Sequence, residues 1–307
     1  MRKASLDQVF ELAKQDPRVF FIGSDLGAGT LDEFRKTIPD RFFMEGISEA
    51  HIIGMAAGLA LEGKIPYINT ISTFFSRRAL EQIILDLCLH HVPVRLIANG
   101  GGLVYAPLGP THLAIDDISL LRTIPNMTVI APCDAEEMKR CMKQTLDYPG
   151  PIYIRVAKGG DPVVSVASHE FKIGRAIEMR SGNDVLIVTT GVTLKPALEA
   201  ADALNQRGIQ TGVLHMHTIK PLDHDALIRM MGPVRAVVAI EENTVIGGLG
   251  SAVAEVLAEA NFPTVKKFRR IGVPDVFPDE YGSQASLMNK YSINVNGLIS
   301  VINGFLG

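Results

Sequence analysis

The sequence has no tryptophan and only three cysteines in 307 residues. Cys88, Cys133 and Cys141 are scattered and form no Cys-x-x-Cys pair, so neither a disulfide framework nor a thiolate metal cluster is expected. The amino-terminal residues lack the apolar core of a signal peptide, and no apolar run reaches the roughly 18 residues of a membrane-spanning helix. These absences favour a protein of the reducing cytoplasm.

A strong charge of either sign is also missing. Thirty Lys and Arg residues against 33 Asp and Glu residues give a net charge of -3, without any block of like charges. A nucleic-acid footprint or a polybasic membrane patch would need such a block, so small molecules or other proteins are the expected partners. Walker and Gly-x-Ser-x-Gly motifs are absent as well, which excludes the simplest nucleotide and hydrolase sites.

The chain is instead rich in hydrophobic residues (47%) and contains 28 glycines. That composition is typical of α/β proteins whose strands are buried on both faces. Apolar strands alternate with helical patterns on both sides of a loose stretch at 161–169, and the length suits two domains of about 150 residues. We therefore predict two consecutive α/β domains, 1–163 and 175–307, joined by a linker at 164–174. Each should have a mostly parallel sheet with helices on both faces.

One carboxylate stands in the glycine-rich apolar segment from Glu45 to Leu61. Ser48 resembles a helix N-cap, Glu49 falls in the first turn, and apolar residues then recur at helical spacing, so the helix should be buried on nearly every face. A buried first-turn carboxyl can share a proton, as catalytic acids and bases do. The simpler interpretation is a solvated Glu49 that only supports the helix N-terminus.

Other candidate site residues follow strands, because ligands of open α/β sheets bind beyond the strands' carboxyl ends. Asp25 ends the first apolar strand, where it could equally stabilise a turn. The strand that starts at Ile65 runs into Phe74 and Phe75, which could pack in a core or stack on a heterocycle. His112 follows a Gly-Pro-Thr turn, and an imidazole can transfer protons near neutral pH.

Two arginines complete the candidates. Arg78 lies at the start of the helix expected to run to His91, and Arg155 ends a strand that begins at Pro151. Either could hold a phosphate group by charge-assisted hydrogen bonds, or form ordinary ion pairs. The glycine-rich segment 241–251 lacks the Lys and the spacing of a phosphate-binding loop, so packing or an interface is its expected role.

With these landmarks, the whole chain resembles the C-terminal half of the thiamine-diphosphate enzymes of the transketolase family. It especially resembles 1-deoxyxylulose-5-phosphate synthases and the small subunits of split transketolases. The resemblance rests on segments 46–51, 72–75, 78–82, 109–112 and 219–223 and on the Glu-Glu-Asn and Gly-Gly-Leu-Gly runs within 241–250. It implies a pyrimidine-binding domain followed by the transketolase C-terminal domain. The beta subunits of 2-oxo acid dehydrogenases share this layout.

The resemblance also implies how the cofactor is held. Glu49 would hydrogen-bond the aminopyrimidine ring of thiamine diphosphate and so promote deprotonation of the thiazolium ring. The aromatic residue that stacks on the pyrimidine is Phe75 when counted back from the arginine of the motif, and Phe74 when counted forward from Ser72; we favour Phe75. Asp25 would lie near the cofactor.

The same resemblance implies substrate contacts. His112 matches a catalytic histidine near the reacting carbonyl group, and Arg78 and Arg155 match arginines that hold substrate phosphate. Two positions depart from the pattern: Leu108 stands where the sugar enzymes have an aspartate, and Gly100 stands where transketolases have a histidine. An acceptor pocket more apolar than in those enzymes is therefore expected.

The diphosphate-binding domain of the family, with its Gly-Asp-Gly and asparagine motif for Mg²⁺, has no counterpart in the sequence. A partner chain that carries this domain, the N-terminal transketolase subunit, should complete the site around a homodimeric core, giving an α2β2 heterotetramer. The expected function is the smaller subunit of a split transketolase-like enzyme that moves a two-carbon ketol unit between carbonyl compounds, such as sugar phosphates. Alternatives are a beta subunit of 2-oxo acid dehydrogenase type, a carboligase like deoxyxylulose-phosphate synthase, or a non-catalytic scaffold.

Overall fold

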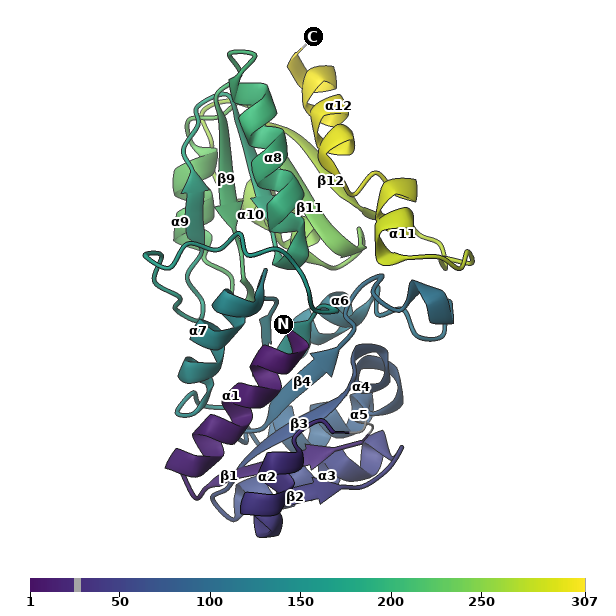
Figure 1. Ribbon diagram of the computed structural model, residues 1–307. Coiled ribbons are helices and arrows are strands. Elements are labelled where there is room, and N and C mark those ends of the chain that lie inside the picture. The colour runs from purple at the N-terminus through teal and green to yellow at the C-terminus, as the bar shows by residue number, and fades with distance from the viewer. Residues whose placement is uncertain (25–28, 307) are drawn as a thin grey trace.

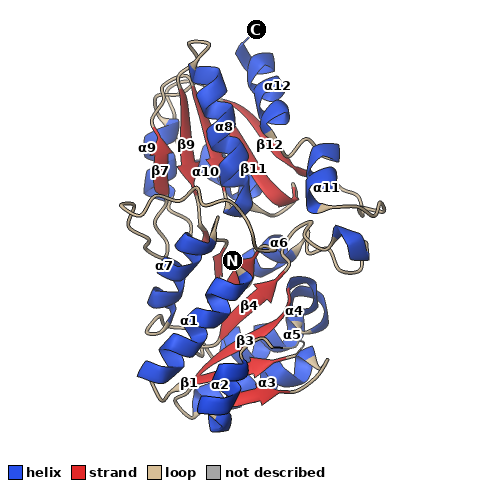
Figure 2. Ribbon diagram, viewed as in Figure 1, coloured by secondary structure: helices blue, strands red, loops and turns tan. Residues whose placement is uncertain are grey.

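The structure, a computed structural model, describes residues 1–24 and 29–306. It consists of two α/β units, each built on one sheet, with the N-terminal unit at the bottom and the C-terminal unit at the top of Figure 1. Helices flank both sheets (Figure 2). The predicted class, two consecutive α/β domains with mostly parallel sheets, is confirmed.

The first sheet has the strand order β10-β5-β6-β4-β3-β1-β2, and every pairing except β10 with β5 is parallel. Its central strands are mostly apolar and almost completely buried, as is typical of parallel strands covered on both faces. The strands are β1 (Val19–Gly23), β2 (Phe42–Met44), β3 (Ile65–Ile71), β4 (Arg95–Asn99), β5 (Thr128–Ile130), β6 (Ile152–Val156) and β10 (Thr218–Lys220).

The helices of this unit divide between the two faces of its sheet. α1 and α7 pack in one apolar cluster, and α3, η2 and α6 in another. The helical segments are α1 (Arg2–Gln15), α2 (Asp32–Thr37), η1 (Pro39–Arg41), α3 (Glu49–Leu61), α4 (Ser72–Arg78), α5 (Leu80–Gln82), the π-helical η2 (Ile83–Leu89), η3 (Ala106–Leu108), α6 (Asp117–Arg122) and α7 (Ala135–Thr145).

The second sheet has the order β12-β11-β8-β9-β7, and only its edge strand β7 runs antiparallel. α8, α11 and α12 pack on one face, and α9 and α10 on the other. The elements are β7 (Ile177–Arg180), β8 (Val185–Thr189), η4 (Gly191–Thr193), α8 (Leu194–Asn205), β9 (Thr211–His215), α9 (His224–Met231), β11 (Ala236–Thr244), α10 (Leu249–Glu259), β12 (Lys267–Val273), α11 (Gln284–Lys290) and α12 (Val295–Leu306).

The two units are joined by more than the segment between β6 and β7. β10, which follows β9 in the chain, leaves the second unit and pairs with β5 at the edge of the first sheet. Arg122 at the end of α6 forms an ion pair with Glu255 of α10, with 2.6 Å between guanidinium nitrogen and carboxylate oxygen. A strand exchanged in this way fixes the edge of one sheet to the other unit.

Two local expectations were wrong. The strand from Ile65 ends at Ile71, and the next helix begins at Ser72 rather than at the arginines, which places Phe74 on a helix. α3 is buried on one side only, and Gly54, Gly58 and Leu61 are exposed. The sequence analysis predicted none of β7, β10, β12, α11 and α12. Among the described residues, no helix has both the length and the apolar character needed to cross a membrane.

Candidate active site

Glu49 is the first residue of α3, at the position that the sequence indicated, and its carboxylate is buried with only 4% of the side chain exposed. Ser48 is the N-cap residue, but its hydroxyl donates to the Glu45 carbonyl at 2.9 Å instead of capping the helix. The interpretation of Glu49 as a solvated helix-supporting residue is therefore wrong.

Two hydroxyl groups hold the inner oxygen of this carboxylate. Ser24 Oγ donates to Glu49 Oε1 at 3.2 Å, and Thr70 Oγ1 lies 3.4 Å from the same oxygen and 3.1 Å from Ser24 Oγ. Ser24 directly follows β1 and Thr70 lies near the end of β3, its parallel neighbour. Neither residue was predicted from the sequence, although both lie at strand ends, where the rule that selected Asp25 could have found them. Asp25 itself lies outside the described residues.

Arg78 covers the outer oxygen. Its Nη1 lies 3.4 Å from Glu49 Oε2, and its guanidinium carbon lies 3.7 Å from the centroid of the Phe74 ring. A guanidinium group over an aromatic face is attracted by the ring's quadrupole. The Arg78 side chain is half exposed, so it is a cation that a ligand could still reach.

The ring of Phe74 connects this pair to the predicted histidine. Phe74 and His112 meet edge-on, with ring centroids 5.4 Å apart at an interplanar angle of 64°. The Thr111 hydroxyl contacts Nδ1 of His112 at 2.9 Å. Glu49, Arg78, Phe74 and His112 thus form a continuous row that joins the start of α3, α4 and the loop after η3.

Phe75, the aromatic residue that we favoured for stacking, is fully buried and packs edge-on against Tyr153 at 6.5 Å. Successive residues of a helix point about 100° apart, so only one of two adjacent rings on α4 can face the site. The preference for Phe75 was wrong, and Phe74 is the partly exposed ring beside Arg78 and His112.

Arg155 is not placed to bind substrate phosphate. It forms an ion pair with the fully buried Asp117 at 2.9 Å, and its Nη2 also donates to the carbonyl oxygens of Ala114 and Glu242. Burial lowers the pKa of this guanidinium, but Asp117 and Glu242 outweigh burial and raise it overall. The prediction of a phosphate contact was therefore wrong, because buried protein groups already occupy these donors.

The two departures from the sugar-enzyme pattern have structural counterparts. Gly100 has φ +72°, and a Cβ atom there would lie 2.0 Å from the Tyr105 ring, so a histidine does not fit without moving Tyr105. Leu108 ends η3 in the loop that carries His112, and about half of its surface is exposed. An apolar residue therefore stands at the rim where the sugar enzymes have an acid.

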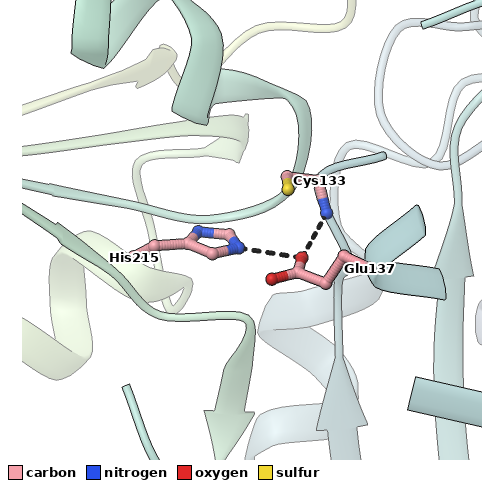
Figure 3. A group of neighbouring side chains, drawn as sticks. All are labelled: Cys133, Glu137 and His215. Carbon is pink, nitrogen blue, oxygen red and sulfur yellow. Dashed lines mark hydrogen bonds and ion pairs between the residues drawn. The ribbon is translucent and has the colours of Figure 1, made fainter. Parts of the chain in front are cut away.

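Cys133, Glu137 and His215 come together where α7 meets β9 (Figure 3). Among the described residues they are the one such group of three possible metal ligands, and their sequence spacing did not indicate it. His215 Nε2 lies 3.0 Å from Glu137 Oε2, which also accepts the Cys133 N–H at 2.7 Å. Mg²⁺ prefers oxygen ligands, so this hydrogen-bonded group does not suit the cofactor metal of the family.

The family comparisons divide the chain into two consecutive domains, as the order of its two α/β units does. The family described as the pyrimidine-binding domain of transketolase matches residues 1–160, and the transketolase C-terminal domain matches residues 174–298. A solved structure described as a split gene transketolase, inactive beta4 tetramer, has a TM-score of 0.90 and 36% identity. That match covers 99% of this chain and 97% of the other.

Individual proteins similar to this chain point to the same family. The 6-deoxy-6-sulfo-D-fructose transketolase subunit SqwH of Clostridium sp. (strain MSTE9) is 36% identical over 97% of this chain and 92% of its own length. An apulose-4-phosphate transketolase subunit of Phocaeicola vulgatus is 35% identical over 97% and 94%. The 1-deoxy-D-xylulose-5-phosphate synthase 1 of Geobacter sulfurreducens is 36% identical over 98% of this chain but only 47% of its own length. The chain therefore belongs to the transketolase family and contains its pyrimidine-binding and C-terminal domains.

Proposed function

We propose that this chain is the smaller subunit of a split, thiamine-diphosphate-dependent transketolase that transfers a two-carbon ketol unit between carbonyl substrates. The observation that carries the proposal is the row of Glu49, Arg78, Phe74 and His112. In this row a guanidinium group and a partly exposed ring connect a buried carboxylate to an imidazole. The subunits of named transketolases among the relatives support ketol transfer as the reaction.

The residues present fit the pyrimidine half of the cofactor. Thiamine diphosphate, when bound, supplies a stabilised carbanion for attack on a carbonyl carbon. Glu49 would hold and return a proton at a ring nitrogen of the aminopyrimidine, while Ser24 and Thr70 keep its carboxylate oriented. The Phe74 ring would stack on the pyrimidine, and Asp25, the untested candidate, would stand near it.

His112 would act on the substrate. Because Thr111 contacts Nδ1, Nε2 is the nitrogen that we assign to the substrate oxygen, where it would donate a hydrogen bond or transfer a proton. Arg78 would hold the phosphate of a phosphorylated substrate, exchanging its contact with Glu49 for a bidentate one. Leu108 at the rim would favour a less hydroxylated acceptor than a sugar, since an apolar side chain offers no hydrogen bond.

A partner should complete the site. The diphosphate and Mg²⁺ need oxygen ligands and backbone amides of the kind that the family's N-terminal domain carries. Exposed apolar residues lie on η2 and at the end of α3, which pack against each other; Leu61, Leu85 and Leu89 are 64%, 45% and 71% exposed. Such a surface suits a protein interface. We therefore expect an α2β2 heterotetramer around a dimer of this chain, in the cytoplasm, where its three free, buried thiols would stay reduced.

Calorimetry and turnover assays test the proposal. The isolated chain should bind thiamine diphosphate with Mg²⁺ weakly and show no turnover, whereas mixing it with a diphosphate-binding N-terminal subunit should produce both tight binding and ketol transfer. A ketose phosphate with an aldose phosphate acceptor would be compared with pyruvate plus an aldehyde phosphate, and with a 2-oxo acid plus lipoamide. Tight Mg²⁺-dependent binding by the chain alone, or turnover only with a 2-oxo acid, would overturn the proposal.

A further inference from the structure

The loop that carries His112 is closed at its base. Gly102 and Ala114 exchange backbone hydrogen bonds in both directions, at 3.0 and 3.1 Å, so residues 102–114 form a loop whose two ends lie together. His112 lies two residues before the second end. Its position relative to Phe74 therefore depends on how this base is held.

A side chain from the other unit holds the first arm. Glu242, on β11, accepts the Leu103 N–H at its Oε1 with a donor–acceptor distance of 2.8 Å, and Gln284 of α11 donates to the same oxygen at 2.9 Å. The approach is close enough to require glycine at position 102. A Cβ atom on Gly102 would lie 2.6 Å from the Glu242 carboxyl carbon, and φ there is +69°.

The backbone of Glu242 is linked to the second end of the loop, at Ala114, through Arg155. Arg155 donates to the carbonyl of Ala114 at 2.8 Å and to the carbonyl of Glu242 at 2.9 Å. Two residues along β11, Thr244 N–H donates to the carbonyl of Ile115 at 2.6 Å. Both arms of the loop are thus fastened to the C-terminal end of β11.

We infer that Glu242 is a positioning residue for His112: its carboxylate reaches from the C-terminal unit and fixes the base of the 102–114 loop. The role in turnover rests on the proposed function, whereas the mechanical role does not. In this way the C-terminal domain would contribute to the active site, although the four residues of the row all belong to the N-terminal unit. A misplacement of about 1 Å can cost roughly a hundredfold in rate, so anchoring of this kind matters to catalysis.

The neighbouring residue supplies a matched control. Glu241 is also buried on β11, with 1% of its surface exposed against 3% for Glu242. Its two carboxylate oxygens accept the N–H groups of Leu249 and Gly250 at 2.8 and 2.7 Å, within its own unit at the start of α10. Substituting either acid should destabilise the C-terminal unit, but only Glu242 touches the loop.

Hydrogen exchange measured by mass spectrometry on the full chain is the first test. Glu242→Ala should raise exchange about tenfold or more in peptides covering 101–115, because the buried Leu103 N–H loses its acceptor. Glu241→Ala should raise exchange at the start of α10 and leave 101–115 unchanged. Glu242→Gln keeps a carbonyl oxygen and should restore protection. Gln284→Ala, a milder change at a partly buried residue, should loosen the same loop to a smaller degree and carries the test if Glu242→Ala does not fold.

Turnover with the partner subunit is the second test. Glu242→Ala should lower kcat by at least roughly tenfold, Glu242→Gln should stay within about threefold of wild type, and Glu241→Ala should retain near-normal kcat. Unchanged exchange in 101–115 for both Glu242→Ala and Gln284→Ala would overturn the inference, as would equal losses of kcat in the Glu241 and Glu242 alanine variants. A wild-type pair without turnover would refute the proposed function alone, since the exchange experiment does not depend on it.

Discussion

Glu49 and Arg78 face each other at the edge of the first sheet, with 3.4 Å between the carboxylate and the guanidinium group. The Glu49 side chain is buried, whereas the Arg78 side chain is half exposed. The pair therefore extends from the buried N-terminus of α3 to the solvent. Because half of the Arg78 side chain is exposed, its guanidinium group has room to move onto a ligand, while Ser24 and Thr70 still contact the buried carboxylate. Under the proposed function, Glu49 would keep its inner hydroxyl contacts while its outer oxygen binds the cofactor.

Glu49→Gln should abolish most turnover while leaving the fold intact. The amide keeps the shape but cannot accept and return a proton, and lost proton transfer typically costs about 10²–10⁴-fold in rate. Steady-state kinetics of the reconstituted enzyme and thermal unfolding would be measured side by side. Glu45→Gln, at an exposed acid four residues earlier, is the control and should be nearly silent. Full turnover of the Glu49 variant would reject the catalytic assignment.

Alanine substitutions of the two adjacent phenylalanines should have different effects, one on stability and the other on cofactor binding. Phe75→Ala empties a fully buried site and should cost about 3–5 kcal/mol of unfolding free energy. Phe74→Ala should cost much less stability, yet weaken cofactor binding about tenfold or more, because base–aromatic stacking is worth roughly 1–3 kcal/mol. Urea denaturation and calorimetric titration with the partner present would measure the two effects. The reverse pattern would restore Phe75 as the stacking residue.

Arg78→Ala should raise the KM of a phosphorylated substrate much more than that of its dephosphorylated analogue. The reason is that a bidentate guanidinium–phosphate contact would be lost only with the former. Kinetics with both substrates would measure the difference. Arg77→Ala is the matched control, since Arg77 pairs with Asp116 at 3.0 Å. An equal effect on the two substrates would show that Arg78 does not bind phosphate.

Arg155→Met should act on stability rather than on phosphate recognition. Removing one partner of a buried ion pair leaves Asp117 uncompensated, which typically costs about 3–5 kcal/mol. Urea denaturation would measure the loss. Asp117→Asn breaks the same pair from the other side and should also destabilise the chain. A selective rise in the KM for phosphorylated substrate, without loss of stability, would contradict the structural role.

Stability should depend on pH through Glu242. Burial raises the pKa of this carboxyl from its ordinary 4.5 to about 7, against the opposing effect of Arg155. The folded state therefore binds more protons than the unfolded state between these values. Its protonation contributes stability fully below about pH 4.5, and this contribution is lost as the pH rises through about 7.

Glu242→Gln should remove this dependence. The unfolding free energy of the variant minus that of wild type should increase between about pH 5 and pH 8, by at most about 3 kcal/mol. Urea denaturation of both proteins at the two pH values gives the difference directly. Glu241, whose pKa burial also raises to about 7, is present in both and cancels. A difference that does not change with pH would contradict the assignment.

Local patterns in the sequence were enough to predict the alternation of strands and helices, and hence the two α/β units. Short motifs were enough to predict the family, and the family in turn supported Glu49 and His112 as site candidates. Such features depend on neighbours a few residues apart, where periodicity and chain order carry the information. The candidates at strand ends were found by the same logic, because parallel strands bring their carboxyl ends to one edge.

Tertiary structure alone decided which candidates meet. Phe74 and Phe75 are adjacent residues of the same type, so the sequence does not distinguish them. Because α4 begins at Ser72, one ring faces the site and the other packs in the core. Arg155 could not be told from a ligand-binding arginine until its partner Asp117, 38 residues earlier, was seen beside it. The bond from Leu103 to Glu242 spans 139 residues and two folded units. Contacts of this range depend on how whole sheets pack, and no local pattern of residues encodes that packing.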